Sequence, residues 1–284
     1  MTSLVDWSQK VVPDFRTRII VDADNPILAF KANRDRYTNL PNQLKYAGLP
    51  YFGSAESEDA VTWNVFRSLQ RAGSLNIVSD SLGIGEARGL LLWTLAPESD
   101  DVSTELQYKT GTLIRRFDGV FRGQMTEPDV ILLGNNGIAV IECKLSEPGK
   151  APSHLWEGEF ESVKKRLPVY LGKNPKLLNS GVAEADVAPV YQLVRMAFYA
   201  VELGRQFERQ PVVVSLANRK NWSYKIRRLG KSASDLWEMF QRILGKDSPL
   251  TKAVFWQDFS ELIRGTTLET LSSYISTHPC LRAL

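Results

Sequence analysis

The sequence has few of the side chains on which several common active sites depend. It contains two histidines, His154 and His278, and two cysteines, Cys143 and Cys280, which lie far apart. So few candidate ligands leave no zinc site of the usual spacing, and a Ser-His-Asp triad has little support. The two cysteines do not form the framework of a disulfide-rich secreted domain. We therefore expect no secretory leader and a reducing, cytoplasmic location.

Long apolar runs are also absent. No stretch approaches the roughly 18 apolar residues that a membrane-spanning helix needs, so we expect a soluble protein without a membrane partner. The hydrophobic content of 43% and the charged content of 24% are typical of a globular chain. A net charge of +3 is weak support for an anionic partner, so the distribution of the basic residues matters more than their number.

The chain divides into three expected parts. Residues 1–54 are irregular and rich in proline and glycine, which predicts an arm packed on the core. Residues 55–231 form the expected core. Residues 232–284, with helical patterns over 232–245 and 258–276, are expected to be a C-terminal helical extension of the same domain.

The core residues predict alternating helices and strands. A helix begins after Ser57, where a serine cap and acidic residues precede an apolar stripe. Strand-like residues cover 112–121 and 127–145, with a helix or loop at 154–170. A strong helix pattern follows at 189–207, and a β-branched run at 211–217 predicts a buried strand.

The stretch "EPDVILLGNNGIAVIECKL", residues 127–145, reads as a β-hairpin. Two β-rich runs flank "GNNG", whose residues tolerate the positive φ angles of a tight turn. Either a two-residue or a four-residue loop places Val130 opposite Ile141 and Asp129 opposite Glu142.

Two facing carboxylates among apolar neighbours repel each other unless a cation lies between them. Mg²⁺ suits this position because it binds a few carboxylate oxygens and keeps other positions for water and phosphate. Lys144 shares a strand face with Glu142, so its ammonium group should lie beside the two acids. The alternative is a solvated surface ion pair between Glu142 and Lys144, which contributes little.

Pro128-Asp129 followed by Glu142-Cys143-Lys144 resembles the PD-(D/E)XK nuclease motif. The resemblance covers roughly residues 55–217 and implies a restriction-endonuclease-like core: a mixed central sheet flanked by helices, in the order αβββαβ. Within the superfamily, the chain most resembles bacterial restriction-endonuclease-like proteins of uncharacterised function.

The resemblance implies Mg²⁺-dependent hydrolysis of DNA, with Mn²⁺ as a substitute. Asp129, Glu142 and the backbone carbonyl of Cys143 are the implied metal ligands, and Lys144 is the implied catalytic cation. Glu58 matches an acidic residue that many members carry on the first core helix. On position alone, Glu58 could equally be a first-turn acid that the helix dipole favours.

Two further regions are candidates for substrate contact. Gln192 shares a helix face with Arg195 and Tyr199 and could line the site, although a buried hydrogen-bonding role is the alternative. A basic run after the last core strand predicts nucleic-acid contact, or else a solubilising loop with its aromatic residues tucked inward. Its members are Arg219, Lys220, Trp222, Lys225, Arg227 and Arg228.

These features favour a metal-dependent endonuclease that acts on DNA, in a restriction or defence setting that rests on family analogy. One alternative is a nucleic-acid-binding or assembly protein that retains the fold without cutting. Another is a structural module in which the hairpin charges are incidental. A homodimer is a further expectation, since two copies could cut opposite strands.

Overall fold

A five-stranded β-sheet lies at the centre of the part of the chain that the structure describes. The structure is a computed structural model that describes residues 19–34, 57–118, 127–145, 155–223, 230–278 and 280–281. Across the sheet the strands follow the order β1-β2-β3-β4-β5. They are β1 (Ala87–Leu92), β2 (Val130–Gly134), β3 (Gly137–Cys143), β4 (Gln210–Ala217) and β5 (Leu250–Phe255).

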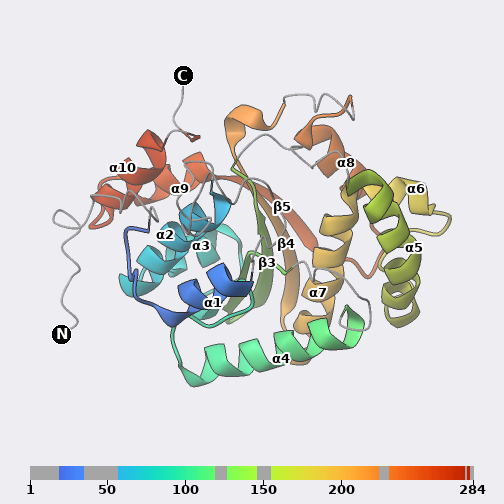
Figure 1. The fold of residues 1–284 in the computed structure, drawn as a ribbon, viewed down its shortest axis with the longest axis horizontal. Helices are drawn as coiled ribbons and strands as arrows, with labels where there is room; N and C mark the ends of the chain where they lie inside the picture. The colour runs from blue at the N-terminus through green and yellow to red at the C-terminus, as the bar shows by residue number, and fades with distance from the viewer. Residues whose placement is uncertain are drawn as a thin grey trace.

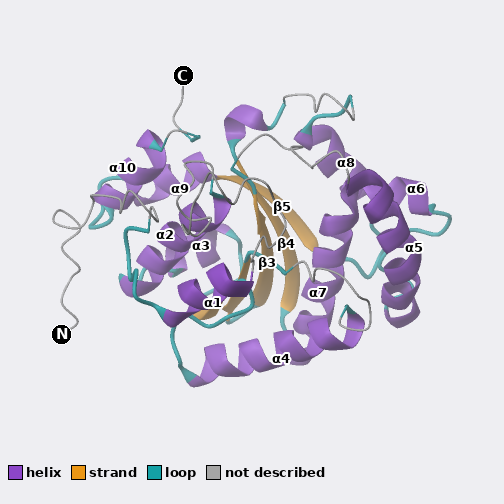
Figure 2. Ribbon diagram, in the orientation of Figure 1, coloured by secondary structure: helices purple, strands orange, loops and turns teal. Residues whose placement is uncertain are grey.

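The sheet is mixed and open. β2 pairs antiparallel with both β1 and β3, whereas β4 pairs parallel with both β3 and β5. The carboxyl ends of β1, β3, β4 and β5 therefore meet at one edge, together with the start of β2. We call this the carboxyl edge of the sheet. The predicted α/β class, with a mixed central sheet flanked by helices, is confirmed (Figure 2).

Helices cover both faces of the sheet (Figure 1). The first layer contains α1 (Pro26–Arg34), α2 (Glu58–Arg71), α3 (Asn76–Ser81), α9 (Trp256–Ile263) and α10 (Glu269–Thr277). The second layer contains α4 (Asp101–Phe117), α5 (Leu155–Lys173), α6 (Glu184–Val187), α7 (Tyr191–Phe207) and α8 (Ala233–Ile243). There are also two short 3₁₀ turns among the described residues: η4 (Ala188–Val190) precedes α7, and η5 (Arg219–Asn221) follows β4. None of the described helices is both long and apolar enough to cross a bilayer.

Alternate side chains of each central strand enter two different hydrophobic cores. Ile141 and Cys143 of β3 pack in the first core, under α2 and α9. Ile138 and Val140 pack in the second core, under α7. Every residue of β2 and β3 is buried. Because helices cover both faces, these strands are continuous apolar runs rather than alternating ones.

The β2–β3 hairpin has the predicted register but not the predicted turn. Val130 pairs with Ile141, and Leu133 pairs with Ile138. No residue of "GNNG" has a positive φ, so that expectation was wrong. The glycines are needed for close packing instead. A Cβ on Gly134 would lie 2.3 Å from the carbonyl oxygen of Ile84, which also accepts hydrogen bonds from the turn.

The strand expected at residues 112–121 is wrong. Residues 112–117 are the end of α4, and 119–121 lie outside the described residues. Thr110, Leu113 and Phe117 are buried at helical spacing, so a 3.6-residue period prevailed over local β propensity. The first strand is instead β1, which contains the consecutive leucines at 90–92.

The C-terminal part was expected to be helical and is only partly so. β5 extends the sheet beyond β4 as an edge strand, and its half-exposed residues give a weak apolar signal. The helix expected at 258–276 is two helices, α9 and α10, separated by Gly265 with a φ of 71°. The helices at 189–207 and 232–245 and the strand at 211–217 appear as α7, α8 and β4, within two residues at each end.

The helix expected after Ser57 is α2, and the Ser57 side chain accepts a hydrogen bond from the Ala60 amide at 3.1 Å. Part of the expected arm packs on α2. The Trp63 indole donates to the carbonyl of Val21 at 2.8 Å, and the Ile20 amide donates to Asn64 at 3.0 Å. Residues 1–18 and 35–56 lie outside the described residues.

Candidate functional site

The carboxyl edge of the sheet brings the two acids of the hairpin together. Asp129 directly precedes β2. The last pair of the hairpin is Val130 with Ile141, and the same register carried one residue further places Asp129 opposite Glu142. The Asp129 Oδ2 atom accepts a hydrogen bond of 2.7 Å from the Cys143 amide, which ties the start of β2 to the end of β3. The predicted pairing therefore places both carboxylates at the same edge.

Glu142 is the most constrained side chain of the site. It is only 3% exposed. Its Oε1 atom lies 2.6 Å from the Lys144 ammonium and also accepts a 2.6 Å hydrogen bond from the Gln192 amide group. Its Oε2 atom is buried and has no hydrogen-bond partner within the described residues. A buried acceptor without a partner is costly, so this oxygen is available for a ligand.

Burial and charge shift the pKa values of the site. Burial, followed by repulsion from Glu142, raises the pKa of Asp129 well above its ordinary value. Burial also raises the pKa of Glu142, although Lys144 opposes this. Burial lowers the pKa of Lys144, but the attraction of the three carboxylates outweighs it, and the pKa of Lys144 lies well above its ordinary range. Lys144 is therefore a permanent cation beside the acids.

Glu58 reaches the same edge from the first turn of α2. Its Oε2 atom accepts a 2.7 Å hydrogen bond from the Leu145 amide, and its Oε1 atom lies 3.7 Å from the Lys144 ammonium. The Glu58 carboxylate lies near the Lys144 cation and also in the first turn of α2. Its environment therefore agrees in part with a site acid and in part with an acid that the helix dipole favours. Glu58 fixes the chain just beyond β3.

The Cys143 side chain lies on the face of β3 opposite to Glu142. It is fully buried in the first core with Ile141 and Leu145. Burial raises the pKa of its thiol well above the ordinary value, so the thiol is neutral. Only the main-chain atoms of Cys143 can contact a ligand at the carboxyl edge.

The donor set fits a hard cation with few protein ligands. Within the described residues, no three side chains of His, Cys, Asp or Glu are grouped so as to hold a metal ion. A metal ion at this edge could have at most two carboxylate side chains, Asp129 and Glu142, and would need main-chain oxygen, water or substrate for its other positions. Mg²⁺ accepts that kind of site, and the buried Oε2 atom of Glu142 is the oxygen that suits it.

A turn after β1, which sequence reasoning missed, positions Asp129. Trp93 and Thr94 have φ angles of 51° and 69°, a conformation that a β-branched threonine rarely adopts. The Trp93 amide donates to the Asp129 carbonyl at 3.0 Å, and the Trp93 ring stacks on Trp63 at 6.0 Å. No glycine or asparagine marks this turn, so the sequence carried no signal for it.

The helix face of α7 that carries Gln192, Arg195 and Tyr199 contacts two different acids. Gln192 contacts Glu142, whereas Arg195 and Tyr199 contact Asp118, which is fully buried in the second core. Asp118 is thus part of a separate buried cluster. Tyr170 also donates to it.

The basic run is only partly described. Lys225, Arg227 and Arg228 lie outside the described residues. Arg219 pairs with Asp258 and lies over the ring of Phe255, while Lys220 is exposed. The aromatic residue among them, Trp222, packs inward, as in the alternative interpretation of a solubilising loop.

Trp222, that aromatic residue, packs against Trp237 and Phe255, with ring centroids 6.4 and 5.4 Å away. Its face is therefore engaged within the protein. Arg219 and Lys220 follow β4 directly, so both lie at the carboxyl edge.

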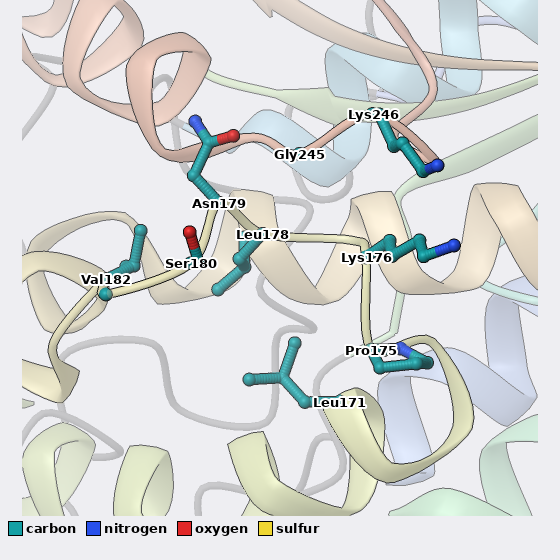
Figure 3. Close-up of a pocket in the computed structure, with 10 residues that line it drawn as sticks. Leu171, Pro175, Lys176, Leu178, Asn179, Ser180, Val182, Gly245 and Lys246 are labelled. Atoms are coloured by element: carbon teal, nitrogen blue, oxygen red, sulfur yellow. The ribbon is translucent and has the colours of Figure 1, made fainter.

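A separate hollow of about 470 Å³ lies beside the loop after α5. Leu171 reaches toward it, and the side chains of Lys176 and Lys246 extend to the same side (Figure 3). The loop that contains Lys246 precedes β5, so this hollow lies at the edge of the sheet opposite the acids. Both lysines are exposed, and none of the described residues that line the hollow is acidic, so the hollow does not include the carboxylate pair.

Comparison of the chain with protein-family models, with curated proteins and with solved structures gives no match.

Proposed function

We propose that the protein is a Mg²⁺-dependent endonuclease that hydrolyses DNA at the carboxyl edge of the sheet. The observation that carries the proposal is the Oε2 atom of Glu142, a buried carboxylate oxygen without a hydrogen-bond partner in the described residues, beside a second acid and a lysine. A cation bound at this edge would occupy that oxygen, whereas the ion pair with Lys144 uses only Oε1 and leaves Oε2 open.

The order of elements supports a restriction-endonuclease-like core. When the intervening helices α3, α4, α5 and α6 and the turn η4 are set aside, α2, β1, β2, β3, α7 and β4 follow the order αβββαβ. Asp129 directly precedes the second strand, Glu142 lies on the third, and Glu58 lies on the first helix of that core. These are the positions that the motif resemblance implies.

Asp129, Glu142 and the Cys143 carbonyl would hold Mg²⁺ or Mn²⁺. When bound, such an ion polarises a phosphate and makes a water more acidic. Lys144 supplies a compact cation that offsets charge developing on phosphate oxygens. Gln192 donates to Glu142 and so fixes the direction of its carboxylate.

Cleavage of plasmid DNA in Mg²⁺ and in Mn²⁺ tests the proposal. We expect the wild type to cut, and Asp129→Asn and Lys144→Met to lose at least about a hundredfold in rate, as for removal of a transition-state contact. Lys176→Ala is the matched control, since that exposed lysine lies at the opposite edge, and it should cut like the wild type. Equal activity in Asp129→Asn would contradict the proposal.

A second candidate is a nucleic-acid-binding protein that does not cut. It is favoured by the hydrogen bonds that Asp129 and Glu58 accept from backbone amides, because these acids stabilise the hairpin without any ion. This candidate predicts salt-sensitive DNA binding with no cleavage in either metal.

A further inference from the structure

Ser215 is a polar residue within the buried, otherwise apolar part of a central strand. The buried residues of β4 read "VVVSLA", and Ser215 is only 8% exposed. Its hydroxyl forms no hydrogen bond within the described residues. Burial of a polar group without a partner costs free energy, so the hydroxyl adds nothing to the packing of this strand. It is available for a ligand that reaches the carboxyl edge.

The register between β3 and β4 places Ser215 beside Glu142. The two residues are partners in the parallel pair, and the pair two residues earlier, Val140 with Val213, lies in the second core. Side chains two residues apart on a strand share a face, so Glu142 and Ser215 continue that row to the carboxyl edge. β3 lies between β2 and β4 in the sheet (Figure 1). Ser215 therefore lies on the side of Glu142 opposite to Asp129.

Glu142 and Ser215 each have an oxygen without a partner. Lys144 and Gln192 both contact the Oε1 atom of Glu142, which leaves Oε2 open among the described residues. Neighbouring strands lie about 4.8 Å apart. Because Mg²⁺ binds oxygen at about 2.1 Å, it can join two oxygens up to about 4.2 Å apart, which suits side chains one strand spacing apart. A serine hydroxyl is an oxygen ligand that Mg²⁺ accepts, and it adds no negative charge beside the two acids.

We propose that Ser215 is a third side-chain ligand of the divalent cation at the carboxyl edge. The inference rests on the proposed function, because it concerns the same metal site, and it adds a residue that the nuclease motif does not contain. The hydroxyl binds the ion from the β4 side, next to the open oxygen of Glu142. Water or substrate fills the remaining positions.

Isothermal titration calorimetry with Mn²⁺ and metal-free protein tests the inference without cleavage. Ser215→Ala removes the oxygen and should weaken Mn²⁺ binding about tenfold. Ser103→Ala is the matched control, because its hydroxyl is also buried without a partner in the described residues. That serine lies on α4 near Gly89, which pairs with Leu133 at the end of β2 far from Asp129. The control should bind Mn²⁺ like the wild type.

Ser215→Cys tests whether the side chain contacts the ion itself. A thiolate suits Zn²⁺, whereas Mg²⁺ and Mn²⁺ prefer oxygen. This variant should therefore bind Mn²⁺ as weakly as Ser215→Ala does, but bind Zn²⁺ more tightly than Ser215→Ala does. Ser215→Ala keeps both native cysteines, so it gives the background for Zn²⁺. A change in packing alone would not reverse the preference between the two ions.

The three variants should melt close to the wild type in EDTA, since neither serine hydroxyl has a hydrogen-bond partner in the described residues. The inference is overturned if Ser215→Ala binds Mn²⁺ like the wild type. It is also overturned if Ser215→Cys binds Zn²⁺ no more tightly than Ser215→Ala does.

The proposed function can fail separately. Mn²⁺ binding that depends on Ser215, with no plasmid cleavage in Mg²⁺ or Mn²⁺, would support the third ligand and overturn the nuclease proposal. Cleavage that depends on Asp129, together with unchanged Mn²⁺ binding in Ser215→Ala, would do the reverse. A wild type that binds neither Mg²⁺ nor Mn²⁺ would overturn both.

Discussion

Asp118 and Glu142 are buried carboxylates that each have a basic partner, and they differ in how completely their oxygens are satisfied. Asp118 has no exposed surface, and both of its oxygens have partners: Tyr170 donates to Oδ1, and Tyr199 and Arg195 contact Oδ2. Glu142 is 3% exposed, yet its Oε2 atom has no hydrogen-bond partner in the described residues. Their basic partners, Arg195 for Asp118 and Lys144 for Glu142, differ in exposure.

Arg195 is 2% exposed, so the charges around Asp118 are sealed within the second core. Lys144 is 38% exposed and lies at the carboxyl edge, where a ligand can approach. A buried carboxylate whose two oxygens both have partners stabilises one arrangement of helices, whereas a carboxylate with an open oxygen at the sheet edge retains capacity to bind. The difference teaches that burial of charge alone does not identify a functional site. Glu142 combines an open carboxylate oxygen with a partly exposed cation at the sheet edge, and Asp118 has neither.

The largest effect should come from breaking the satisfied cluster. Asp118→Ala leaves Arg195 without its carboxylate and two tyrosine hydroxyls without their acceptor, so we expect a loss of about 3–5 kcal/mol in the free energy of unfolding. Urea unfolding measures this. Glu161→Ala removes an exposed ion pair on α5 and should have no measurable effect. A small loss in Asp118→Ala would show that the cluster is not structural.

At the carboxyl edge, by contrast, we expect a substitution of Asp129 to increase the free energy of unfolding. Asp129→Asn keeps an acceptor for the Cys143 amide but removes a buried charge that Glu142 repels. We expect the metal-free variant to be about 1 kcal/mol more stable than the wild type near neutral pH.

The same variant tests pH dependence. Because the folded-state pKa of Asp129 is raised, its contribution is fully present below its ordinary pKa of 3.8 and is lost as pH rises through the folded value. The stability advantage of Asp129→Asn in urea unfolding should therefore grow as pH rises above 3.8. An advantage that shrinks with rising pH would contradict the assigned shift.

The smallest effect concerns the turn beside the acids. Thr94→Gly relieves a φ of 69° at a β-branched residue and should raise the free energy of unfolding by about 1 kcal/mol, net of the added backbone entropy. Thr94→Ala keeps the strained backbone with a Cβ and should not gain as much. Equal stability of both variants would mean that the turn carries no strain.

The hairpin register could be predicted because its two apolar runs and short turn leave a single consistent pairing. Val130 and Ile141 pair as the spacing requires, and the approach of Lys144 to Glu142 follows from their separation of two residues. The role of Gly134 could not be predicted. It depends on Ile84, which is distant in sequence and packs against the turn.

Other misses also came from tertiary context. Residues 112–117 carry β-favouring side chains, but their buried positions follow a helical period against β1. β5 was missed because an edge strand with half-exposed residues has a weak apolar pattern. The separation of Gln192 from Arg195, one at the site and the other at Asp118, depends on how α7 crosses the sheet, which spacing along a helix does not specify.

Divalent-ion titration of the melting temperature tests the central claim most directly, with the wild type and Glu142→Gln compared in Mg²⁺ and in Mn²⁺. An ion that binds only the folded protein raises its melting temperature with concentration. The account predicts such a rise in the wild type and its loss in Glu142→Gln, which has one neutral oxygen in place of the open carboxylate. A melting temperature that does not respond to either ion, or that rises equally in both proteins, would contradict it.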